Sequence, residues 1–259
     1  MYLLSDIGNT RVKLGIFEEK NSTPIYYKPI EHSNAVDLVN ELNNIKNNYP
    51  NIEHVFYSSV SLKVNDLFEG SVEDCFDMKP YRVTHHDIKL KDNLYEPKDA
   101  VGIDRLLSTY ASICLENTNE DKYASIVIDM GTATTISIMM SDFTFLGGMI
   151  ISGTKTSYQA LSNVTSLPYY EIGPIDSIPN PINNNVKDAI MSGAIYNTIG
   201  TVNYAVAETE KYIKNKYDIK SKIFLTGGIS NLKLLKCKVY PFLVLQGIYF
   251  NMIDKQIKK

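Results

Sequence analysis

The amino-acid sequence predicts an α/β fold made of two similar domains, residues 1–118 and 119–259. One apolar segment ends in Asp6-Ile7-Gly8-Asn9-Thr10, and another, near the middle, ends in Asp129-Met130-Gly131-Thr132. A strand-like segment follows each copy of this pattern. With 259 residues and 44% hydrophobic content, the chain can bury a core in each half. We expect two such halves to face each other across a central cleft.

The first half is predicted to begin with three strands, a helix and a fourth strand. Residues 2–6 and 11–17 are apolar runs, and Gly8-Asn9 between them favours the reversal that would pair them. Residues 25–30 are a candidate third strand. A helix is expected near residues 37–45, where Leu38, Leu42 and Ile45 recur at helical spacing, and residues 55–60 return to a strand pattern.

A loop and a helix are predicted to complete the first half. Residues 85–98 are polar, include Pro97, and show neither helical nor strand periodicity, so we expect an ordered loop over the cleft. A helix is expected from about Gly102. The apolar residues on its buried side are Ile103, Leu106, Leu107, Tyr110 and Cys114.

The second half is predicted to repeat this order. Strands are expected at residues 126–129, 134–140 and 144–151, a helix at 154–161, and a loop rich in Pro and Asn at 166–186. A long helix should run from about residue 187 to 213, with enough apolar surface to join the domains or to pair with a second copy of the chain. The apolar face consists of Ile195, Ile199, Val202 and Val206.

Charge and cysteine content argue against several classes of protein. Lys and Arg number 26 against 29 Asp and Glu, so the net charge of -3 offers no basic field for a nucleic-acid partner. Cys75, Cys114 and Cys237 are too few and too widely spaced to predict a disulfide framework or a zinc site. No apolar run is long enough to cross a membrane, and Asp6 interrupts the first one, so a cytoplasmic location without membrane association is expected.

The first repeated turn has the residue types of a phosphate-binding site. Gly8 would let a phosphate approach the backbone, Asn9 and Thr10 could donate hydrogen bonds, and Lys13 adds positive charge. Asp6 could hold Mg²⁺ on nucleotide phosphates, because this ion commonly takes one or two protein carboxylates. A plain hairpin is the alternative. The second copy of the turn favours nucleotide binding, as does the later Thr226-Gly227-Gly228 turn.

In the second copy, Asp129 ends a strand and Gly131-Thr132 forms the turn. Thr132 could donate to a phosphate, which would leave Asp129 to bind a cation or a water molecule. An ordinary hairpin is again the alternative interpretation.

Tyr95-x-Pro97 and Gly102-Ile103-Asp104-Arg105 are the most specific part of the middle region. Phosphoryl transfer from ATP needs a carboxylate that accepts the proton of the attacking hydroxyl, and Asp104 is a candidate for that role. Arg105 could bind a carboxylate or phosphate through its two-pronged donor set. The alternative is that Asp104 only stabilises the helix dipole and that Arg105 is solvated.

His85-His86-Asp87 suggests a metal site by composition. Adjacent side chains of an extended chain point in opposite directions, however, so the two imidazoles would form a poor chelate. The segment is therefore predicted to be a surface loop.

Together these motifs resemble the type III pantothenate kinases, in order, over most of the chain. The matching residues are Asp6-x-Gly8-Asn9-Thr10-x-x-Lys13, Tyr95-x-Pro97, Gly102-x-Asp104-Arg105, Asp129-x-Gly131-Thr132-Ala133-x-Thr135, Gly147-Gly148-x-Ile150, Thr156-Ser157-Tyr158, Ala160-Leu161, Leu167-Pro168, Ser192-Gly193, Thr226-Gly227-Gly228 and Leu243-x-Leu245-x-Gly247. The resemblance implies the duplicated RNase H-like fold of actin-like ATPases, shared with acetate and sugar kinases and Hsp70, in a homodimer. It also implies that the chain converts pantothenate and ATP to 4′-phosphopantothenate and ADP, the first step toward coenzyme A.

The resemblance assigns roles to individual residues. Asp104 would be the general base on the pantothenate hydroxyl, and Asp129 would hold the potassium or ammonium ion that this family requires. Thr132 would contact the ATP phosphates from the opposite domain. The first turn would line the phosphates through Asp6, Ile7, Gly8, Asn9, Thr10, Arg11, Val12 and Lys13. Pantothenate would be contacted by Tyr95, Gly102, Ile103, Asp104 and Arg105.

Two positions depart from the family pattern. Ser152 stands where the family usually has Pro, and Val186 stands where it usually has Thr. That Thr would contact pantothenate across the dimer. Val186 has the shape of that Thr but lacks its hydroxyl, so it cannot form a side-chain hydrogen bond to the substrate.

Two alternative functions remain open from the sequence. One is a non-catalytic regulator of the same fold that binds a nucleotide or a pantothenate-like ligand; loss of Asp6, Asp104 or Asp129 would favour it, and all three are present. The other is a different phosphotransferase or phosphatase of this fold, such as an acetate or sugar kinase. Those chains are generally longer and are not expected to carry Tyr95-x-Pro97 ahead of Gly102-x-Asp104-Arg105.

Overall fold

The computed structural model describes residues 1–32, 34–116, 122–170, 177–228 and 237–253. Contacts within the chain define two compact units. The first comprises Met1–Thr118, Phe143–Phe145 and Phe242–Lys259, and the second comprises Asn119–Asp142 and Leu146–Pro241. The carboxyl-terminal segment groups with the first unit, whereas the sequence analysis assigned it to the second half.

The first unit contains a five-stranded mixed sheet in the order β3-β2-β1-β4-β5. Its strands are β1 (Tyr2–Ile7), β2 (Arg11–Glu18), β3 (Asn21–Glu31), β4 (His54–Ser59) and β5 (Tyr81–Arg82). β1 pairs antiparallel with β2 and parallel with β4. The predicted pairing of the first two strands is therefore confirmed, and β3 extends the sheet beyond β2.

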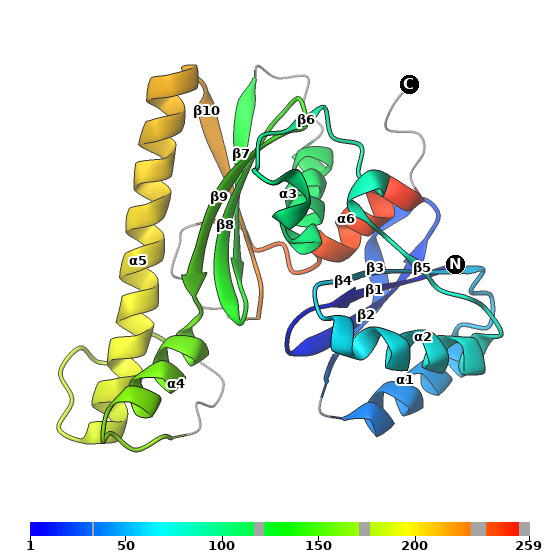
Figure 1. The fold of residues 1–259 in the computed structure, drawn as a ribbon, viewed down its shortest axis with the longest axis horizontal. Helices are drawn as coiled ribbons and strands as arrows, with labels where there is room; N and C mark the ends of the chain where they lie inside the picture. The colour runs from blue at the N-terminus through cyan, green and yellow to red at the C-terminus, as the bar shows by residue number, and fades with distance from the viewer. Residues whose placement is uncertain (33, 117–121, 171–176, 229–236, 254–259) are drawn as a thin grey trace. The chain divides into compact units, whose positions relative to one another are not determined.

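Two helices, α1 (Ala35–Asn48) and α2 (Leu62–Phe76), cover one face of this sheet (Figure 1). Alternate strand residues such as Leu3, Ile7 and Leu14 form the core with them, as expected for a period of two. Helix α2 was not predicted from the sequence. Its signal was present, because Val64, Phe68, Val72 and Cys75 are buried at helical spacing.

The opposite face of the sheet packs against α6 (Leu243–Met252), which itself packs on α3 (Ile103–Glu116). The Phe17 and Tyr249 rings stack with centroids 5.7 Å apart. The Tyr249 hydroxyl donates to the Glu19 carbonyl at 2.7 Å, and Gln246 Nε2 donates to the Ser22 carbonyl at 3.0 Å. These contacts are the physical reason why the last helix belongs to the first unit.

The second unit repeats the strand order of the first. Its sheet runs β10-β7-β8-β9, where β7 is Tyr123–Met130, β8 is Ala133–Met140, β9 is Thr144–Ser152 and β10 is Lys220–Thr226. β7 pairs antiparallel with β8 and parallel with β10, just as β1 pairs with β2 and β4. The prediction of an α/β chain with two similar halves is confirmed. β6 (Asp92–Asn93) pairs with the first residues of β9 inside the first unit.

Helix α5 (Val186–Tyr217) lies along the sheet of the second unit, and α4 (Thr154–Val164) packs against α5 (Figure 1). Ile195, Val202 and Val206 are buried, and the last two belong to a core with Ile126, Ile128 and Ile136. The apolar stripe that predicted pairing with another domain or chain is therefore largely used within the second unit. In the described part of the chain, no helix has the length and apolar character needed to cross a membrane.

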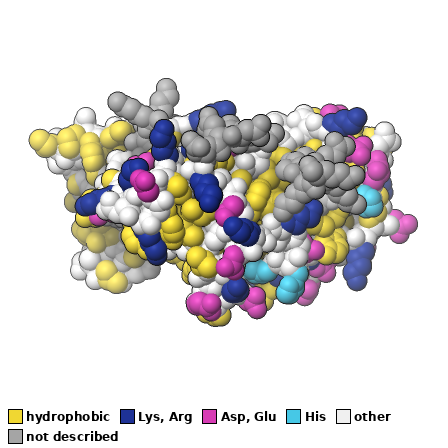
Figure 2. All heavy atoms as spheres, turned by 90° about the horizontal axis from the view of Figure 1, so that it is seen from above, with side chains coloured by type: hydrophobic (Ala, Val, Ile, Leu, Met, Phe, Trp, Pro, Cys, Tyr) yellow, Lys and Arg dark blue, Asp and Glu magenta, His cyan; other side chains and the backbone are white. Residues whose placement is uncertain are grey.

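Charges of both signs are mixed on the surface. On the face shown in Figure 2, Lys and Arg side chains lie among Asp and Glu side chains instead of forming one basic patch. In the described part of the chain Cys75, Cys114 and Cys237 form no disulfide, and Cys75 and Cys114 are buried.

Candidate active site

Asp6, one residue before the end of β1, is a buried carboxylate with a neighbouring cation. Only 3% of the residue is exposed, and its Oδ2 lies 2.8 Å from Lys13 Nζ. Strand register causes this pairing, because Lys13 stands opposite Asp6 on β2 and Ser58 stands opposite it on β4. The Ser58 hydroxyl donates to Asp6 Oδ1 at 3.5 Å. One carboxylate at a strand end, with a cation that can turn to a phosphate, fits a magnesium–phosphate site.

The turn after Asp6 is open to a ligand. Gly8 N donates to the Arg11 carbonyl at 3.0 Å and closes the hairpin, while His32 N donates to the Thr10 carbonyl at 3.0 Å. Asn9 and Thr10 are exposed. A Cβ on Gly8 would meet nothing closer than the Arg11 carbonyl oxygen at 3.5 Å, an ordinary contact. The fold therefore has room for a side chain at Gly8. The lack of a side chain there leaves the backbone accessible to a ligand.

The second turn occupies the equivalent place in the second unit. Asp129 stands opposite Thr135 on β8 and Thr226 on β10, just as Asp6 stands opposite Lys13 and Ser58. The start of α4 holds this turn, because the Thr132 carbonyl accepts hydrogen bonds from Thr156 Oγ1 at 2.6 Å and from Gly153 N at 3.2 Å. The Thr132 side chain stays exposed. The backbone of Thr132 is therefore held by hydrogen bonds from the start of α4, while its side chain faces solvent.

Gly227 brings bare backbone against the Asp129 carboxylate. It has a φ of 99°, and a Cβ there would lie 2.6 Å from Asp129 Oδ1 and 2.5 Å from Met130 N. Only glycine fits both the conformation and the space. The predicted turn at Thr226-Gly227-Gly228 does end β10. A carboxylate next to backbone, with no side chain between, is chemically suited to a cation that takes oxygen ligands.

Asp104 lies in the first turn of α3 with its carboxylate held by backbone. Arg105 N donates to Asp104 Oδ1 at 2.9 Å and to the Gly102 carbonyl at 3.1 Å. A Cβ on Gly102 would lie 2.5 Å from Asp104 Oδ1, so this glycine makes room for the carboxylate. Asp104 is half-buried, which leaves it accessible to a substrate. The arrangement can accept a proton from a hydroxyl bound in front of α3.

Arg105 and Tyr95, both predicted as substrate-binding residues, contact each other. The Arg105 guanidinium carbon lies 5.5 Å from the Tyr95 ring centre and 5.9 Å from that of Phe145. Only 4% of Arg105 is exposed, so the cation–π contacts are largely shielded from water. The Glu96–Pro97 peptide bond beside Tyr95 is cis. Phe145 was missed by the sequence analysis, because a single aromatic residue in a strand carries no signal of a distant arginine.

Other predicted residues present backbone or lie apart. The Ile7, Val12 and Ile103 side chains are buried, so only their backbone could touch a ligand. Arg11 is exposed and forms an ion pair with Glu31 at 3.2 Å. Val186 begins α5 and is 49% exposed. The residues that bear chemistry form separate groups: Asp6, Lys13, Tyr95, Asp104 and Arg105 lie in the first unit, and Asp129, Thr132 and Val186 lie in the second.

Ser152 has a structural partner of its own. Its hydroxyl lies 2.7 Å from that of Ser157, so the end of β9 is tied to the first turn of α4. Proline, the usual family residue, could not form this hydrogen bond. The departure at Ser152 therefore brings in a polar link between strand and helix.

The segment His85–Asp87 forms the 3-10 turn η1. Asp87 accepts hydrogen bonds from Thr84 N at 2.8 Å, Thr84 Oγ1 at 2.9 Å and the Tyr81 hydroxyl at 2.8 Å. Burial acts to raise the pKa of Asp87, but the hydrogen bonds from Thr84 and Tyr81 hold that pKa below its ordinary value. Among the described residues, no group of three or more His, Cys, Asp or Glu side chains could hold a metal ion.

Comparison with known proteins identifies similar sequences. Residues 2–208 match the family model described as type III pantothenate kinase. A protein named type III pantothenate kinase from Sulfurihydrogenibium sp. (strain YO3AOP1) is 30% identical over 266 residues. That alignment covers 98% of this chain and 100% of the relative.

Solved structures of quite different sequence are also similar. MreB 5 of Spiroplasma citri, bound to AMPPNP, has a TM-score of 0.49 at 11% identity, over 99% of this chain and 97% of that one. The inorganic polyphosphate/ATP-glucomannokinase from Arthrobacter sp. strain KM has a TM-score of 0.46 at 13% identity, over 98% of each chain. The fold described above rests on the matching strand orders of the two units.

Proposed function

Because this chain belongs to the family of type III pantothenate kinases, we propose which of its residues carry out the phosphorylation of pantothenate by ATP. The protein is a kinase whose products are 4′-phosphopantothenate and ADP, in coenzyme A biosynthesis. The observation that carries the residue assignment is the half-buried Asp104 carboxylate at the start of α3, near the Arg105–Tyr95 pair.

Each of the two repeated turns offers donors suited to the phosphates of ATP. Asn9 and Thr10 donate to phosphate oxygens from the exposed first turn, and Gly8 lets the phosphate reach the backbone. Lys13 exchanges its ion pair with Asp6 for one with a phosphate. Thr132 donates from the second turn, whose backbone is supported by Thr156.

Asp6 is the protein ligand for Mg²⁺ that accompanies ATP. Its Oδ2 is held by Lys13, which can move to the phosphates, and its Oδ1 faces Ser58 Oγ at 3.5 Å. Magnesium, when bound, neutralises charge that develops on the phosphate oxygens. The burial of Asp6 keeps its carboxylate at a fixed place on the sheet.

Pantothenate binds in front of α3. Arg105 attracts the substrate carboxylate, Tyr95 packs beside it, and backbone at Gly102 and Ile103 completes the contact. Asp104 accepts the proton of the substrate hydroxyl while the oxygen of that hydroxyl bonds to the γ-phosphorus of ATP. The bond between that phosphorus and the β–γ bridging oxygen breaks, and ADP leaves with the electron pair. Across the dimer, Val186 of the second copy offers pantothenate an apolar contact where a hydroxyl is usual in the family.

ADP release with ATP and Mg²⁺, measured with and without pantothenate, tests this function. We expect release that depends on pantothenate and yields a phosphorylated product of matching mass. Folded protein that binds a nucleotide but releases no ADP would favour a non-catalytic regulator. Release with another hydroxyl compound alone would favour a different acceptor substrate.

Asp129 holds a monovalent cation, potassium or ammonium, near the second turn. The support is a carboxylate beside the bare backbone of Gly227, where a Cβ would lie 2.6 Å from Asp129 Oδ1. A cation there offsets phosphate charge that one Mg²⁺ leaves unbalanced.

Replacing potassium by sodium is expected to lower the rate about tenfold, equivalent to about 1.4 kcal/mol of transition-state stabilisation. Sodium is smaller and holds its water more tightly than potassium. Initial rates in chloride salts at constant ionic strength would measure the effect. Asp129→Asn should remove the difference between the two ions, and equal rates in both salts for the unaltered protein would reject the assignment.

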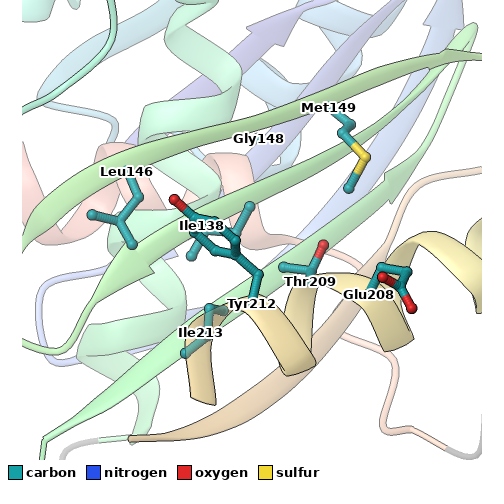
Figure 3. A pocket seen from close by; sticks show the side chains of 8 residues that line it. All are labelled: Ile138, Leu146, Gly148, Met149, Glu208, Thr209, Tyr212 and Ile213. Atoms are coloured by element: carbon teal, nitrogen blue, oxygen red, sulfur yellow. The ribbon is translucent and has the colours of Figure 1, made fainter. Parts of the chain in front are cut away.

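The protein is a homodimer that pairs through the second unit. An apolar groove of about 320 Å³ lies between β8, β9 and α5. Figure 3 shows the side chains that line it, among them Tyr212. Its lining residues are Ile138, Leu146, Gly148, Met149, Glu208, Thr209, Tyr212 and Ile213. Tyr212 is 57% exposed, a large apolar area for a helix that already buries its opposite side.

Tyr212→Lys is expected to convert the dimer to a monomer, because it places a charge in the proposed interface. Light scattering coupled to size-exclusion chromatography measures the mass directly. Tyr81→Lys is the control, since Tyr81 is 48% exposed in the first unit, away from the groove. A dimer that survives Tyr212→Lys would place the interface elsewhere.

We assign the activity to the cytoplasm, where ATP is supplied.

A further inference from the structure

His85 contacts the backbone that precedes the catalytic segment. Its Nε2 lies 2.7 Å from the carbonyl oxygen of Val101. A carbonyl oxygen can only accept, so His85 Nε2 carries the proton and donates. Val101 is buried, and the next four residues are Gly102, Ile103, Asp104 and Arg105. The imidazole therefore holds the chain directly before the proposed base.

The turn that carries His85 is anchored to the sheet of the first unit. Val83 N donates to the Tyr57 carbonyl at 2.8 Å, directly after β5. The next residues form the turn in which Asp87 accepts three hydrogen bonds, from Thr84 N, Thr84 Oγ1 and the Tyr81 hydroxyl. Several hydrogen bonds therefore hold the turn that carries His85. Through its contact with Val101, His85 links the edge of the sheet to the backbone just before α3.

Hydrogen bonding at the start of α3 shows why this contact matters. α3 begins at Ile103, so Arg105 N is among the first N–H groups, which have no acceptor within the helix. Arg105 N donates to the Gly102 carbonyl at 3.1 Å and to Asp104 Oδ1 at 2.9 Å. Val101 lies just before this turn in an extended conformation, and His85 supplies a donor for its carbonyl. The backbone that directs Arg105 N–H at the Asp104 carboxylate therefore starts from a residue that His85 holds.

We propose that His85 is a positioning residue for pantothenate phosphorylation: its hydrogen bond to the Val101 carbonyl fixes the backbone just before Gly102 and so orients Asp104, the general base. The proposal rests on the assignment of Asp104 under the proposed function. Without the imidazole donor, the Val101 carbonyl loses this hydrogen bond and the backbone at the start of α3 can shift. The Asp104 carboxylate, which accepts from Arg105 N, then shifts relative to the substrate hydroxyl.

Two substitutions at His85 separate donation from bulk. His85→Gln keeps an N–H donor at similar reach, whereas His85→Leu has similar size and no donor. We expect His85→Leu to lower kcat for pantothenate phosphorylation about 10- to 100-fold, because small misplacements of a reacting group carry penalties of that order. His85→Gln should retain most of kcat. The KM for ATP should stay unchanged in both variants, since the phosphate turns are untouched.

His86→Leu is the matched control, because His86 is the exposed neighbour in the same turn. Thermal unfolding of all variants shows whether the fold is retained. Equal loss of kcat in His85→Gln and His85→Leu would overturn the proposal, and so would wild-type kcat in His85→Leu. Should His85→Leu fail to fold, a His85→Gln variant with low kcat would still reject it.

Asp104→Asn, assayed in parallel, distinguishes failure of this inference from failure of the proposed function. An active Asp104→Asn variant would remove the base itself. An inactive one, together with wild-type kcat in His85→Leu, would leave the base in place and reject only the role of His85.

Discussion

Asparagine in place of Asp104 is expected to lower kcat about 10²- to 10⁴-fold, the range associated with loss of a general base. The amide cannot accept the proton of the pantothenate hydroxyl at neutral pH. Its Oδ1 can still accept the hydrogen bond that Arg105 N now donates at 2.9 Å. The start of α3 therefore keeps its geometry, and the loss should appear in kcat with little change in the KM for ATP.

The control for this variant is Asp99→Asn, an exposed acid a few residues earlier in the chain. It removes the same charge from the same segment and should leave kcat unchanged. Circular dichroism and thermal unfolding would show that both variants are folded. Wild-type kcat in Asp104→Asn would exclude Asp104 as the base, whereas equal losses in both variants would indicate a general effect of charge.

Alanine in place of Gly153 is expected to destabilise the second unit by about 1 to 3 kcal/mol, the usual cost of overpacking. A Cβ there would lie 2.4 Å from the carbonyl oxygens of both Gly131 and Thr132. Backbone atoms cannot move aside as the end of a side chain can. The φ of -68° and ψ of 163° at Gly153 suit alanine, so the effect is steric and owes nothing to backbone strain.

The same substitution should weaken ATP binding, because it pushes the backbone of Thr132 out of place. Gly131→Ala is the matched control in the same turn, since a Cβ on Gly131 would lie 3.4 Å from the nearest atom, the Ala133 carbonyl oxygen. Gly131→Ala should change the melting temperature little and raise the KM for ATP. Equal melting temperatures for both variants and the unaltered protein would contradict the packing argument.

Glycines in different parts of the chain thus serve different purposes, which the sequence does not distinguish. Gly8 has room for a side chain, so its backbone is open to a phosphate. Gly153, Gly227 and Gly247 have no such room, and Gly247 allows α6 to approach the Leu107 backbone of α3. A motif match cannot separate these cases, because the atoms that would clash come from residues far away in the chain.

Tyr95 and Arg105 illustrate how far the candidate site could be predicted. Both were expected at the substrate site, and the structure places the Arg105 guanidinium over the Tyr95 ring. Phe145 completes this group from a strand that follows some forty residues later. Its participation depends on the pairing of β6 with β9, which no local pattern indicates.

His85 shows the opposite limit. The sequence offered a His-His-Asp segment that is a poor chelate, and the expectation was a surface loop. The structure gives one imidazole a defined partner, the Val101 carbonyl at 2.7 Å. Hydrogen-bond partners of this kind are set by the path of two loops, and loop paths follow from the packing of the elements that flank them.

The sequence alone determined the α/β class, the duplication, and the family to which the chain belongs, because Asp6-x-Gly8 and Asp129-x-Gly131 are local patterns with local physical meaning. The periodicity of apolar residues and the residue types of turns involve positions close together in the chain, so both can be recognised in the sequence. Tertiary structure decided that α6 packs in the first unit, that the apolar stripe of α5 covers its own sheet, and that His85 supports the start of α3. These features depend on contacts between residues that are distant in the chain. Such contacts exist only in the folded protein, so no local sequence pattern indicates them.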